Sequence, residues 1–359
     1  MKVHLVGGFL GSGKTTAITN ASVKLRDAGI IAGVVTNDQG NYLVDSRFID
    51  SNAIPSCEVT GGCFCCNFNE LDEQIQTLLH DEHPSVIFAE SVGSCTDLVA
   101  TVLRPLIKYR KDEIASFTLS IFADARLLLK YLQQEKLDFS DEISYIFEKQ
   151  IEEAHILIAN KVDLLHPEQL KALKVLATDA FPDKIMLYQN SLDFESIELW
   201  LQTIDNYNQD TVHKTIDIDY QIYGKGEAHL AWLDEEIEIN GNNAWNEAIS
   251  IIEKIKSDLE IQHLNIGHLK FLISNIHKSA KLSFTSIPNM DWKSSLVPLD
   301  GEKIILMVNA RVETTPENLR NIVYEIVREA SRKSSITIQE HCVSAFQPGF
   351  PNPTYRMAE

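Results

Sequence analysis

The residues at positions 8–15 carry the clearest chemical signal in this sequence. They read Gly-Phe-Leu-Gly-Ser-Gly-Lys-Thr, which fits the pattern G-x-x-x-x-G-K-[ST]. Glycines let successive backbone N–H groups turn toward a phosphate, and the N-terminus of the helix that follows adds partial positive charge. We therefore predict that a nucleoside triphosphate binds here, with Lys14 on the β- and γ-phosphates and Thr15 on a magnesium ion. The expected contacts come from Gly8, Gly11, Ser12, Gly13, Lys14, Thr15 and Thr16.

An acid and a glycine at positions 90 and 93 fit the same chemistry. Glu90 closes a short apolar run, so its carboxylate can act on the magnesium ion directly or through water. Gly93 can donate its N–H to the γ-phosphate and so respond to hydrolysis. Lys14, Glu90 and Gly93 are the predicted catalytic residues, and the group that activates the attacking water is not identified. The segment 94–97 also suits a helix cap, and both interpretations can hold.

The run Asn160-Lys161-Val162-Asp163 predicts which base is bound. The carboxylate of Asp163 can accept hydrogen bonds from the N1–H and 2-amino group of guanine, which adenine does not offer. Asn160 would support the phosphate-binding loop, and the stem of Lys161 would lie on the base. A site built around such polar partners discriminates strongly against a base that lacks them. A helix N-cap is the alternative, but the sequence favours GTP with Mg²⁺.

Three cysteines lie within four positions of the glycine-flanked run 61–66. The thiolates of Cys63, Cys65 and Cys66 would form a soft site for Zn²⁺, or for Co²⁺ or Ni²⁺, with a fourth position open. We expect Cys66 to begin the next helix, whose N-terminus would lower its thiol pKa. A reversible disulfide switch and a packed cluster without a ligand are the alternatives. The candidates for a fourth ligand are Asp38, Cys57, Glu58 and Cys95.

Short apolar runs alternate with helical patterns through residues 1–205. Because repeated β-α units build a doubly wound, mostly parallel sheet, we predict an α/β fold of the P-loop NTPase type. Its functional loops should follow the carboxyl ends of the strands, and the polar segment 37–56 is predicted to be such a loop. Strands are expected at 3–6, 30–36, 85–90, 116–122, 155–159 and 185–188.

The pattern changes after a polar linker at 206–215. Longer alternating strands and two helices, at 245–259 and 316–331, predict a smaller α+β domain of the split-βαβ kind over 216–359. Its strands are expected at 215–222, 228–239, 266–275, 278–285, 303–311 and 335–346. Two scattered histidines, His229 and His268, are the ones that could matter for metal, although a lone histidine is usually structural.

Composition excludes several classes of function. The chain has 359 residues, 44% of them hydrophobic, and a net charge of −19 from 32 basic and 51 acidic residues. Such an acidic protein is not expected to bind nucleic acid, because little would neutralise the phosphate backbone. The sequence has no apolar run near eighteen residues, and no signal peptide is expected, so we predict a cytoplasmic protein without a membrane contact.

Taken together, the phosphate-binding loop, G-G-C-F-C-C, E-x-x-G and N-K-V-D resemble the CobW-like metal-chaperone GTPases, relatives of the nickel GTPases HypB and UreG. The resemblance covers residues 1 to about 205. It implies GTP hydrolysis coupled to metal delivery to a client metalloprotein or cofactor-assembly protein, with Cys63, Cys65 and Cys66 as the transfer site. Two alternatives stay open: a GTPase that assembles or reactivates a metallocofactor enzyme such as a corrinoid protein, and a redox-sensing interaction protein. A homodimer is left open.

The sequence departs from the family pattern at two places. The usual N-E-F-G-E is replaced by N-D-Q-G-N at 37–41, which leaves Asp38 as the remaining acid there. The usual L-A-D-P after E-x-x-G is replaced by S-C-T-D at 94–97, which adds the thiol of Cys95. These changes indicate a divergent member with a specialised client.

Overall fold

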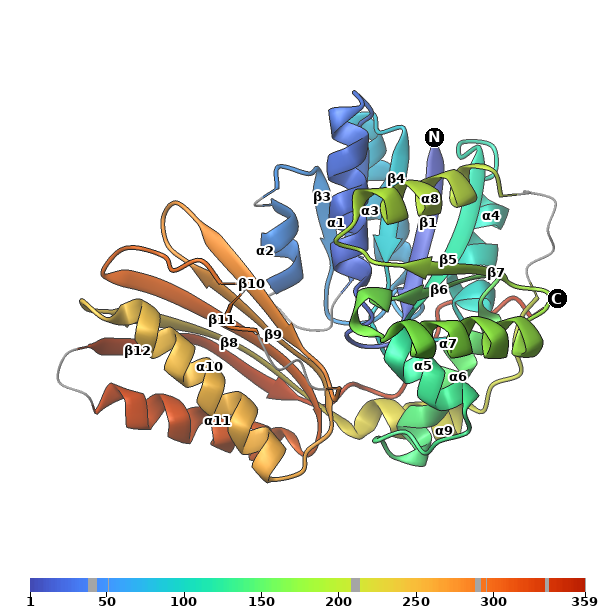
Figure 1. Ribbon diagram of the computed structural model, residues 1–359. Coiled ribbons are helices and arrows are strands. Elements are labelled where there is room, and N and C mark those ends of the chain that lie inside the picture. Colours follow the sequence, from blue (N-terminus) through green and yellow to red (C-terminus); the bar gives the residue numbers. More distant parts are fainter. Residues whose placement is uncertain are drawn as a thin grey trace. The chain divides into compact units, whose positions relative to one another are not determined.

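The computed structural model describes residues 1–37, 44–50, 52–207, 214–287, 292–294, 296–332 and 336–358 (Figure 1). Asp38 and most of the expected linker therefore lie outside the described residues. The chain forms two compact units. The first comprises Met1–Gln39, Asn52–Gly226 and Phe350–Glu359, and the second comprises Gly40–Ser51 and Glu227–Gly349.

A seven-stranded parallel sheet is the centre of the first unit (Figure 1). Its strand order is β3-β2-β4-β1-β5-β6-β7, and each pairing is parallel. Apolar residues fill the inner strands because both faces of such a sheet are covered by helices. The predicted doubly wound α/β fold is confirmed. The strands are β1 (Lys2–Gly8), β2 (Ala32–Asn37), β3 (Ser56–Val59), β4 (Val86–Glu90), β5 (Ser116–Asp124), β6 (Ile156–Asn160) and β7 (Ile185–Gln189).

Helices connect these strands, and a π-helical turn at Val99–Leu103 leads into one of them. They are α1 (Lys14–Asp27), α3 (Phe68–Glu82), α4 (Arg104–Arg110), α5 (Ala125–Leu132), α6 (Asp141–Glu153), α7 (Pro167–Ala180) and α8 (Phe194–Asp205), followed by α9 (Tyr220–Ala228). The register of the sheet sets Val6 beside Glu90 and Asp124 beside Asn160. The carboxyl ends of four strands thus bring the predicted motifs to one edge.

The second unit has a five-stranded antiparallel sheet of order β10-β9-β11-β8-β12. Two helices pack on one face, with Ile251 and Val323 in the shared apolar core. The predicted antiparallel α+β architecture is confirmed. The elements are β8 (Leu230–Asn240), α10 (Ala244–Ile261), β9 (Ile266–Ser274), β10 (Ser279–Phe284), β11 (Lys303–Glu313), α11 (Pro316–Ser331) and β12 (Thr337–Phe346).

Helix α2 (Val44–Asp50) covers the other face of that sheet. Val44 packs with Leu272 and Met307, whose neighbours along the strands point into the opposite core. The Asp45 carboxylate pairs with Lys270 and Lys281 of β9 and β10. The prediction of a loop throughout 37–56 is therefore wrong.

The predicted strand at 215–222 is also wrong, because α9 begins at Tyr220. The Asp219 carboxylate accepts hydrogen bonds from the N–H groups of Gln221 and Ile222, which caps the helix. The expected domain limits, 1–205 and 216–359, remain a prediction. They follow chain order, whereas the compact units assign residues 44–50 to the second unit and 350–358 to the first. Within the described ranges, no helix is long and apolar enough to cross a bilayer.

Candidate nucleotide and metal site

The loop between β1 and α1 has the close contacts that require glycine. Gly8 has a φ of 125°, and a Cβ there would lie 2.1 Å from the carbonyl oxygen of Phe122. Gly13 has a φ of 91°, and its Cβ would lie 2.4 Å from Nδ2 of Asn160. The Nζ of Lys14 donates to the carbonyl oxygen of Gly8 over 2.8 Å, so the lysine lies over the loop. The first turn of α1 has no acid, which leaves its positive end suited to a phosphate.

Thr15 and Glu90 meet beside this loop. The Thr15 hydroxyl donates to Oε1 of Glu90 over 2.9 Å, and both side chains are buried. The parallel pairing of β1 with β4 accounts for the meeting, since it sets Val6 opposite Glu90. A hydroxyl and a carboxylate next to a phosphate-binding loop are oxygen ligands of the kind that Mg²⁺ prefers. These two residues therefore fit a magnesium ion.

Gly93 packs against the phosphate-binding loop. A Cβ at this position would lie 2.8 Å from Cδ2 and 3.0 Å from the backbone nitrogen of Leu10, so a larger residue would require the loop to shift. The side-chain amide of Gln150 donates to the carbonyl oxygens of Gly93 and Cys95, over 3.1 and 2.7 Å. Helix α6 thereby fixes the turn that runs from Gly93 to Cys95.

Asn160 joins three segments at the same edge. Its Nδ2 donates to the carbonyl oxygen of Ser12 over 2.7 Å, and its Oδ1 accepts from the backbone N–H and the hydroxyl of Ser191. Lys161 has a φ of 65°, and its Nζ donates to Asp124 over 3.2 Å. Asp163 is exposed in a short turn of 3-10 helix, and its contact with a guanine base remains a prediction.

The three sulfurs of the cysteine loop form one cluster. The Sγ atom of Cys63 lies 2.6 Å from that of Cys65 and 3.3 Å from that of Cys66, and the Cys65–Cys66 distance is 3.8 Å. Cys63 and Cys65 are buried and Cys66 is half-buried. Asn37, at the end of β2, accepts from the N–H of Phe64 and donates to the carbonyl oxygen of Gly62. The loop is thus fixed to the sheet edge.

The cluster favours one thiolate. Hydrogen bonds from the thiols of Cys65, Cys66 and Cys95 hold the pKa of Cys63 well below its usual range. The hydrogen bond to Cys63, together with burial, raises the pKa of Cys66 to about 11. The expectation that Cys66 has the lowered pKa is therefore wrong. Its position explains the error, because α3 begins only at Phe68 and the Cys66 thiol faces Cys63 instead.

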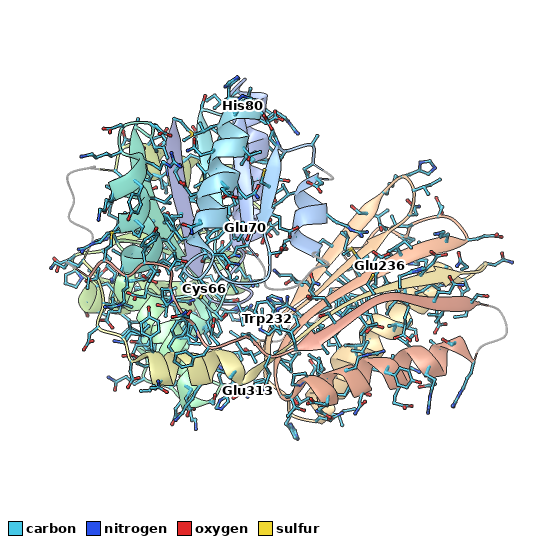
Figure 2. All side chains as sticks on the ribbon, turned by 180° about the vertical axis from the view of Figure 1, so that it is seen from behind. Cys66, Glu70, His80, Trp232, Glu236 and Glu313 are labelled. Atoms are coloured by element: carbon cyan, nitrogen blue, oxygen red, sulfur yellow. The ribbon has the colours of Figure 1, made fainter. Side chains whose placement is uncertain are left out.

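Three of the fourth-ligand candidates lie in the described residues. Of these, Cys95 is the one that the structure brings to this cluster. Its buried thiol interacts with those of Cys63 and Cys65. Cys57, on β3, has a thiol pKa raised by burial and by the charges of Asp81 and Glu82 at the end of α3. Figure 2 shows Glu70 and His80 in order along that helix, with Cys66 in the turn before its start. Cys57 therefore lies toward the other end of α3, with Glu58 next to it in the strand.

Two histidines singled out by sequence do not join a metal cluster. His268 is buried and lies opposite Arg311 in the pairing of β9 with β11. His229 is exposed next to the start of β8. Among the described residues, the group of potential ligand atoms that gathers within 4.8 Å is Cys63, Cys65 and Cys66.

A family model described as "CobW/HypB/UreG, nucleotide-binding domain" matches residues 2–187, more than half of the 359 residues. The chain belongs to the CobW/HypB/UreG family. The resemblance predicted from the four motifs is thereby confirmed.

Among the similar proteins are two zinc chaperones. The chain is 33% identical to the zinc chaperone YeiR of Escherichia coli (strain K12) over 181 residues, 48% of this chain and 50% of that protein. It is 28% identical to the zinc chaperone CobW of Sinorhizobium sp over 191 residues, 47% of this chain and 53% of that protein. A crystal structure of HypB from Helicobacter pylori in complex with nickel covers 59% of this chain, at 16% identity and a TM-score of 0.42; 91% of HypB is covered. The chain spans about half the length of these curated relatives.

Sequence reasoning missed some residues that position the nucleotide motifs of this CobW/HypB/UreG protein. Ser191 holds Asn160, and Asp124 holds Lys161 while pairing with Arg126 over 2.7 Å. Their positions in the sequence could have pointed to them, because both residues lie at or just after the carboxyl end of a predicted strand, where ligand-binding loops gather. The sequence does not decide what residues 352–357 contact.

Proposed function

We propose that this protein is a GTP-hydrolysing metallochaperone that binds Zn²⁺ at the cysteine cluster and delivers it to a client protein. One observation supports this most directly: a span of six residues, 90–95, connects the two sites. Glu90, at one end, accepts from Thr15 of the phosphate-binding loop. Cys95, at the other end, interacts with Cys63 and Cys65.

The nucleotide half uses the groups at the sheet edge. Lys14 would bind the β- and γ-phosphates, and Thr15 and Glu90 would hold Mg²⁺, which supplies neutralisation of the charge that develops on the phosphates. Asn160 supports the loop through Ser12, and Asp163 would accept from guanine. Gly93, against Leu10, would donate its N–H to the γ-phosphate and so distinguish GTP from GDP.

The proposed metal site consists of cysteine thiolates, which are soft ligands, and it lacks few or none of the four ligands of a tetrahedral site. Cys63 is the sulfur most ready to bind, because its neighbours already stabilise its thiolate. Cys65 and Cys66 complete three ligands, and Cys95 is the fourth in this proposal. Tetrahedral thiolate sites suit Zn²⁺, and the two relatives named zinc chaperones support zinc over cobalt and nickel. The metal is cargo here, so the site must release it as well as bind it.

Coupling between the halves follows from the shared span. With GTP bound, Gly93 would be held on the γ-phosphate and Cys95 would stay with the other cysteines. Loss of the γ-phosphate would free the turn after Gly93 and withdraw one metal ligand. By linkage, metal binding must then change GTP affinity by the factor that GTP changes metal affinity.

GTP hydrolysis by the reduced, metal-stripped protein, titrated with Zn²⁺, Co²⁺ and Ni²⁺, tests this proposal. The comparison is a triple variant, Cys63→Ala, Cys65→Ala, Cys66→Ala, with Cys342→Ala as a cysteine control from the second unit. We expect Zn²⁺ to change turnover in the parent and in the control but not in the triple variant. GTP turnover that no metal affects in any of them would reject a metallochaperone.

A redox-sensing role is the second candidate, favoured by the 2.6 Å between the sulfurs of Cys63 and Cys65. Thiol titration under mild oxidant, with and without Zn²⁺, separates the two roles. Loss of thiols without stoichiometric Zn²⁺ binding under reducing conditions supports redox sensing.

A further inference from the structure

The last residues of the chain lie across the cysteine loop. The N–H of Asn352 donates to Sγ of Cys66 over 3.3 Å. Thr354 donates its N–H to the carbonyl oxygen of Cys65 over 2.8 Å and its hydroxyl to that of Cys66 over 2.7 Å. This segment forms no helix or strand, yet it places a backbone donor on one of the proposed ligand sulfurs. Residues 351–357 are called the C-terminal strap below.

The other end of the C-terminal strap is fixed to the segment that follows Gly93. Nε of Arg356 donates to Oδ2 of Asp97 over 2.7 Å, and the Tyr220 hydroxyl donates to the same oxygen over 2.8 Å. One residue further, the N–H of Met357 donates to the carbonyl oxygen of Ala100. Asp97 lies two residues after Cys95. The strap therefore contacts both the metal-binding loop and the segment expected to respond to the nucleotide.

An aromatic contact holds the middle of the strap. The Tyr355 ring lies edge-on to Phe68, with centroids 5.2 Å apart, and 5.5 Å from the ring of Tyr109. Phe68 is the first residue of α3, two residues after Cys66. Asn352, Thr354 and four of the other strap residues are exposed or half-buried, so the strap is a surface covering. Such a segment can open without unfolding the core.

Asp97 needs its partner on the strap. Its carboxylate is fully buried and its backbone has a φ of 63°, in the left-handed region. Loss of Arg356 would leave a buried charge beside the buried Glu153, which is costly. The position of Asp97 and the closure of the strap therefore depend on each other.

We propose that the C-terminal strap closes over the metal-binding cysteines, with the Arg356–Asp97 pair as its lock. Movement of residues 93–97 after hydrolysis would disturb the lock, lift the strap from Cys66 and expose the metal to a client. This inference rests on the proposed function for the identity of the cargo. The covering of the thiols themselves does not depend on it.

Alkylation of the reduced, metal-free protein tests the covering alone. The readout is the rate at which iodoacetamide modifies the peptide that carries Cys63, Cys65 and Cys66, followed by mass spectrometry. The variants are Arg356→Ala and Thr354→Val, and the second leaves the lock intact while removing one hydrogen bond to the loop. The matched control is Arg26→Ala, an exposed arginine at the far end of α1 that donates to Asn52. Circular dichroism verifies that each variant is folded.

We expect Arg356→Ala to accelerate alkylation about tenfold or more, the change expected from the loss of one charge-assisted hydrogen bond. Thr354→Val should accelerate it less, and Arg26→Ala should leave it unchanged. In the parent, GTPγS should slow alkylation relative to GDP, and Arg356→Ala should abolish that difference. Equal rates in the parent, Arg356→Ala and Thr354→Val would overturn the strap, and equal rates with GTPγS and GDP in the parent would overturn its response to the nucleotide.

Transfer of Zn²⁺ from the loaded protein to a chromogenic chelator tests retention of the cargo. The rate should rise in Arg356→Ala and stay unchanged in Arg26→Ala. Faster alkylation with an unchanged transfer rate would overturn the retaining role. A parent that binds no stoichiometric Zn²⁺ would overturn the proposed function, and with it the retaining role, and the alkylation result would still decide whether the strap covers the thiols.

Discussion

The side-chain amide of Asn160 donates to the backbone carbonyl of Ser12 over 2.7 Å and connects the predicted base-recognition segment, 160–163, to the phosphate-binding loop. The same side chain accepts two hydrogen bonds from Ser191. Asn160 is fully buried, so each of its polar atoms depends on these partners. Two loops that we predict to bind different parts of a nucleotide are thus held together by one residue.

Replacing Asn160 should therefore weaken the nucleotide site and the fold together. We expect Asn160→Ala to reduce GTP affinity about tenfold and to lower the free energy of unfolding by about 2 kcal/mol, because buried partners are left unsatisfied. Fluorescent GTP-analogue titration and urea unfolding measure the two effects. Ser191→Ala removes a hydroxyl that donates to Asn160 and accepts from Gln189, but it keeps the backbone donor to Asn160, so both effects should be smaller. Unchanged affinity in Asn160→Ala would mean that Asn160 has only a structural role.

The base preference should depend on the carboxylate of Asp163. The side-chain amide introduced by Asp163→Asn cannot accept from both the N1–H and the 2-amino group of guanine, but its NH₂ can donate to the 2-oxo group of xanthine. We expect this substitution to weaken GTP binding by about 100-fold or more and to strengthen XTP binding. Competition of XTP, GTP and ATP against a fluorescent GTP analogue measures this. Equal loss of both GTP and XTP would indicate a damaged loop instead of altered recognition.

The sequence was informative for those parts of the site in which the chemistry requires particular residue types at a particular spacing. Phosphate and magnesium binding restrict which residues can stand at each position, so the sequence pointed to the phosphate-binding loop, Glu90 and Asn160. The structure brings these residues together, and their roles toward the nucleotide stay predictions. Their mutual approach also followed, since parallel strands bring their carboxyl ends to one edge.

Contacts between distant segments were not predictable in this way. Cys95 was one of four candidates, because its approach to Cys63 depends on how two loops fold on each other. Arg356 and Asp97 are 259 positions apart, and no pattern links them. The alternating run at 215–222 suggested a strand, but the cap at Asp219 starts a helix within it.

Glu90 should matter more for hydrolysis than for binding. Glu90→Gln keeps the size of the side chain and an oxygen that can accept from Thr15, but it removes the negative charge offered to Mg²⁺. We expect single-turnover GTP hydrolysis to slow on the order of 100-fold, with a smaller change in GTP affinity and a higher Mg²⁺ requirement. Glu198→Gln, which alters an exposed pair with Lys24, is the matched control. Equal Mg²⁺ dependence in parent and variant would show that Glu90 does not contribute to Mg²⁺ binding.

Cys95 should contribute to metal affinity, whereas Cys57 should not. Cys95→Ser replaces a soft ligand by a weak one, so we expect the Zn²⁺ affinity to fall at least about tenfold. Cys57→Ser is a matched control on β3 and should bind Zn²⁺ as the parent does. Co²⁺ reports the coordination: the charge-transfer absorption of the parent should lose the intensity of one thiolate in Cys95→Ser only. Identical Co²⁺ spectra for the parent and Cys95→Ser would mean that Cys95 is not a ligand.

Glu153 should make the stability of the first unit depend on pH. Burial and the charge of Asp97 raise the pKa of Glu153 to about 8, from an ordinary value of 4.5. Because the pKa is raised in the folded state, the protonated Glu153 side chain stabilises that state. This contribution is fully present below about pH 4.5 and is lost as pH rises through 8. Glu153→Gln has no proton to lose, so its stability relative to the parent should rise between about pH 5 and about pH 9, by on the order of 3 kcal/mol. Urea unfolding of both proteins across this range measures the difference, and groups common to both cancel. A difference that does not change with pH would show that Glu153 ionises normally in the folded protein.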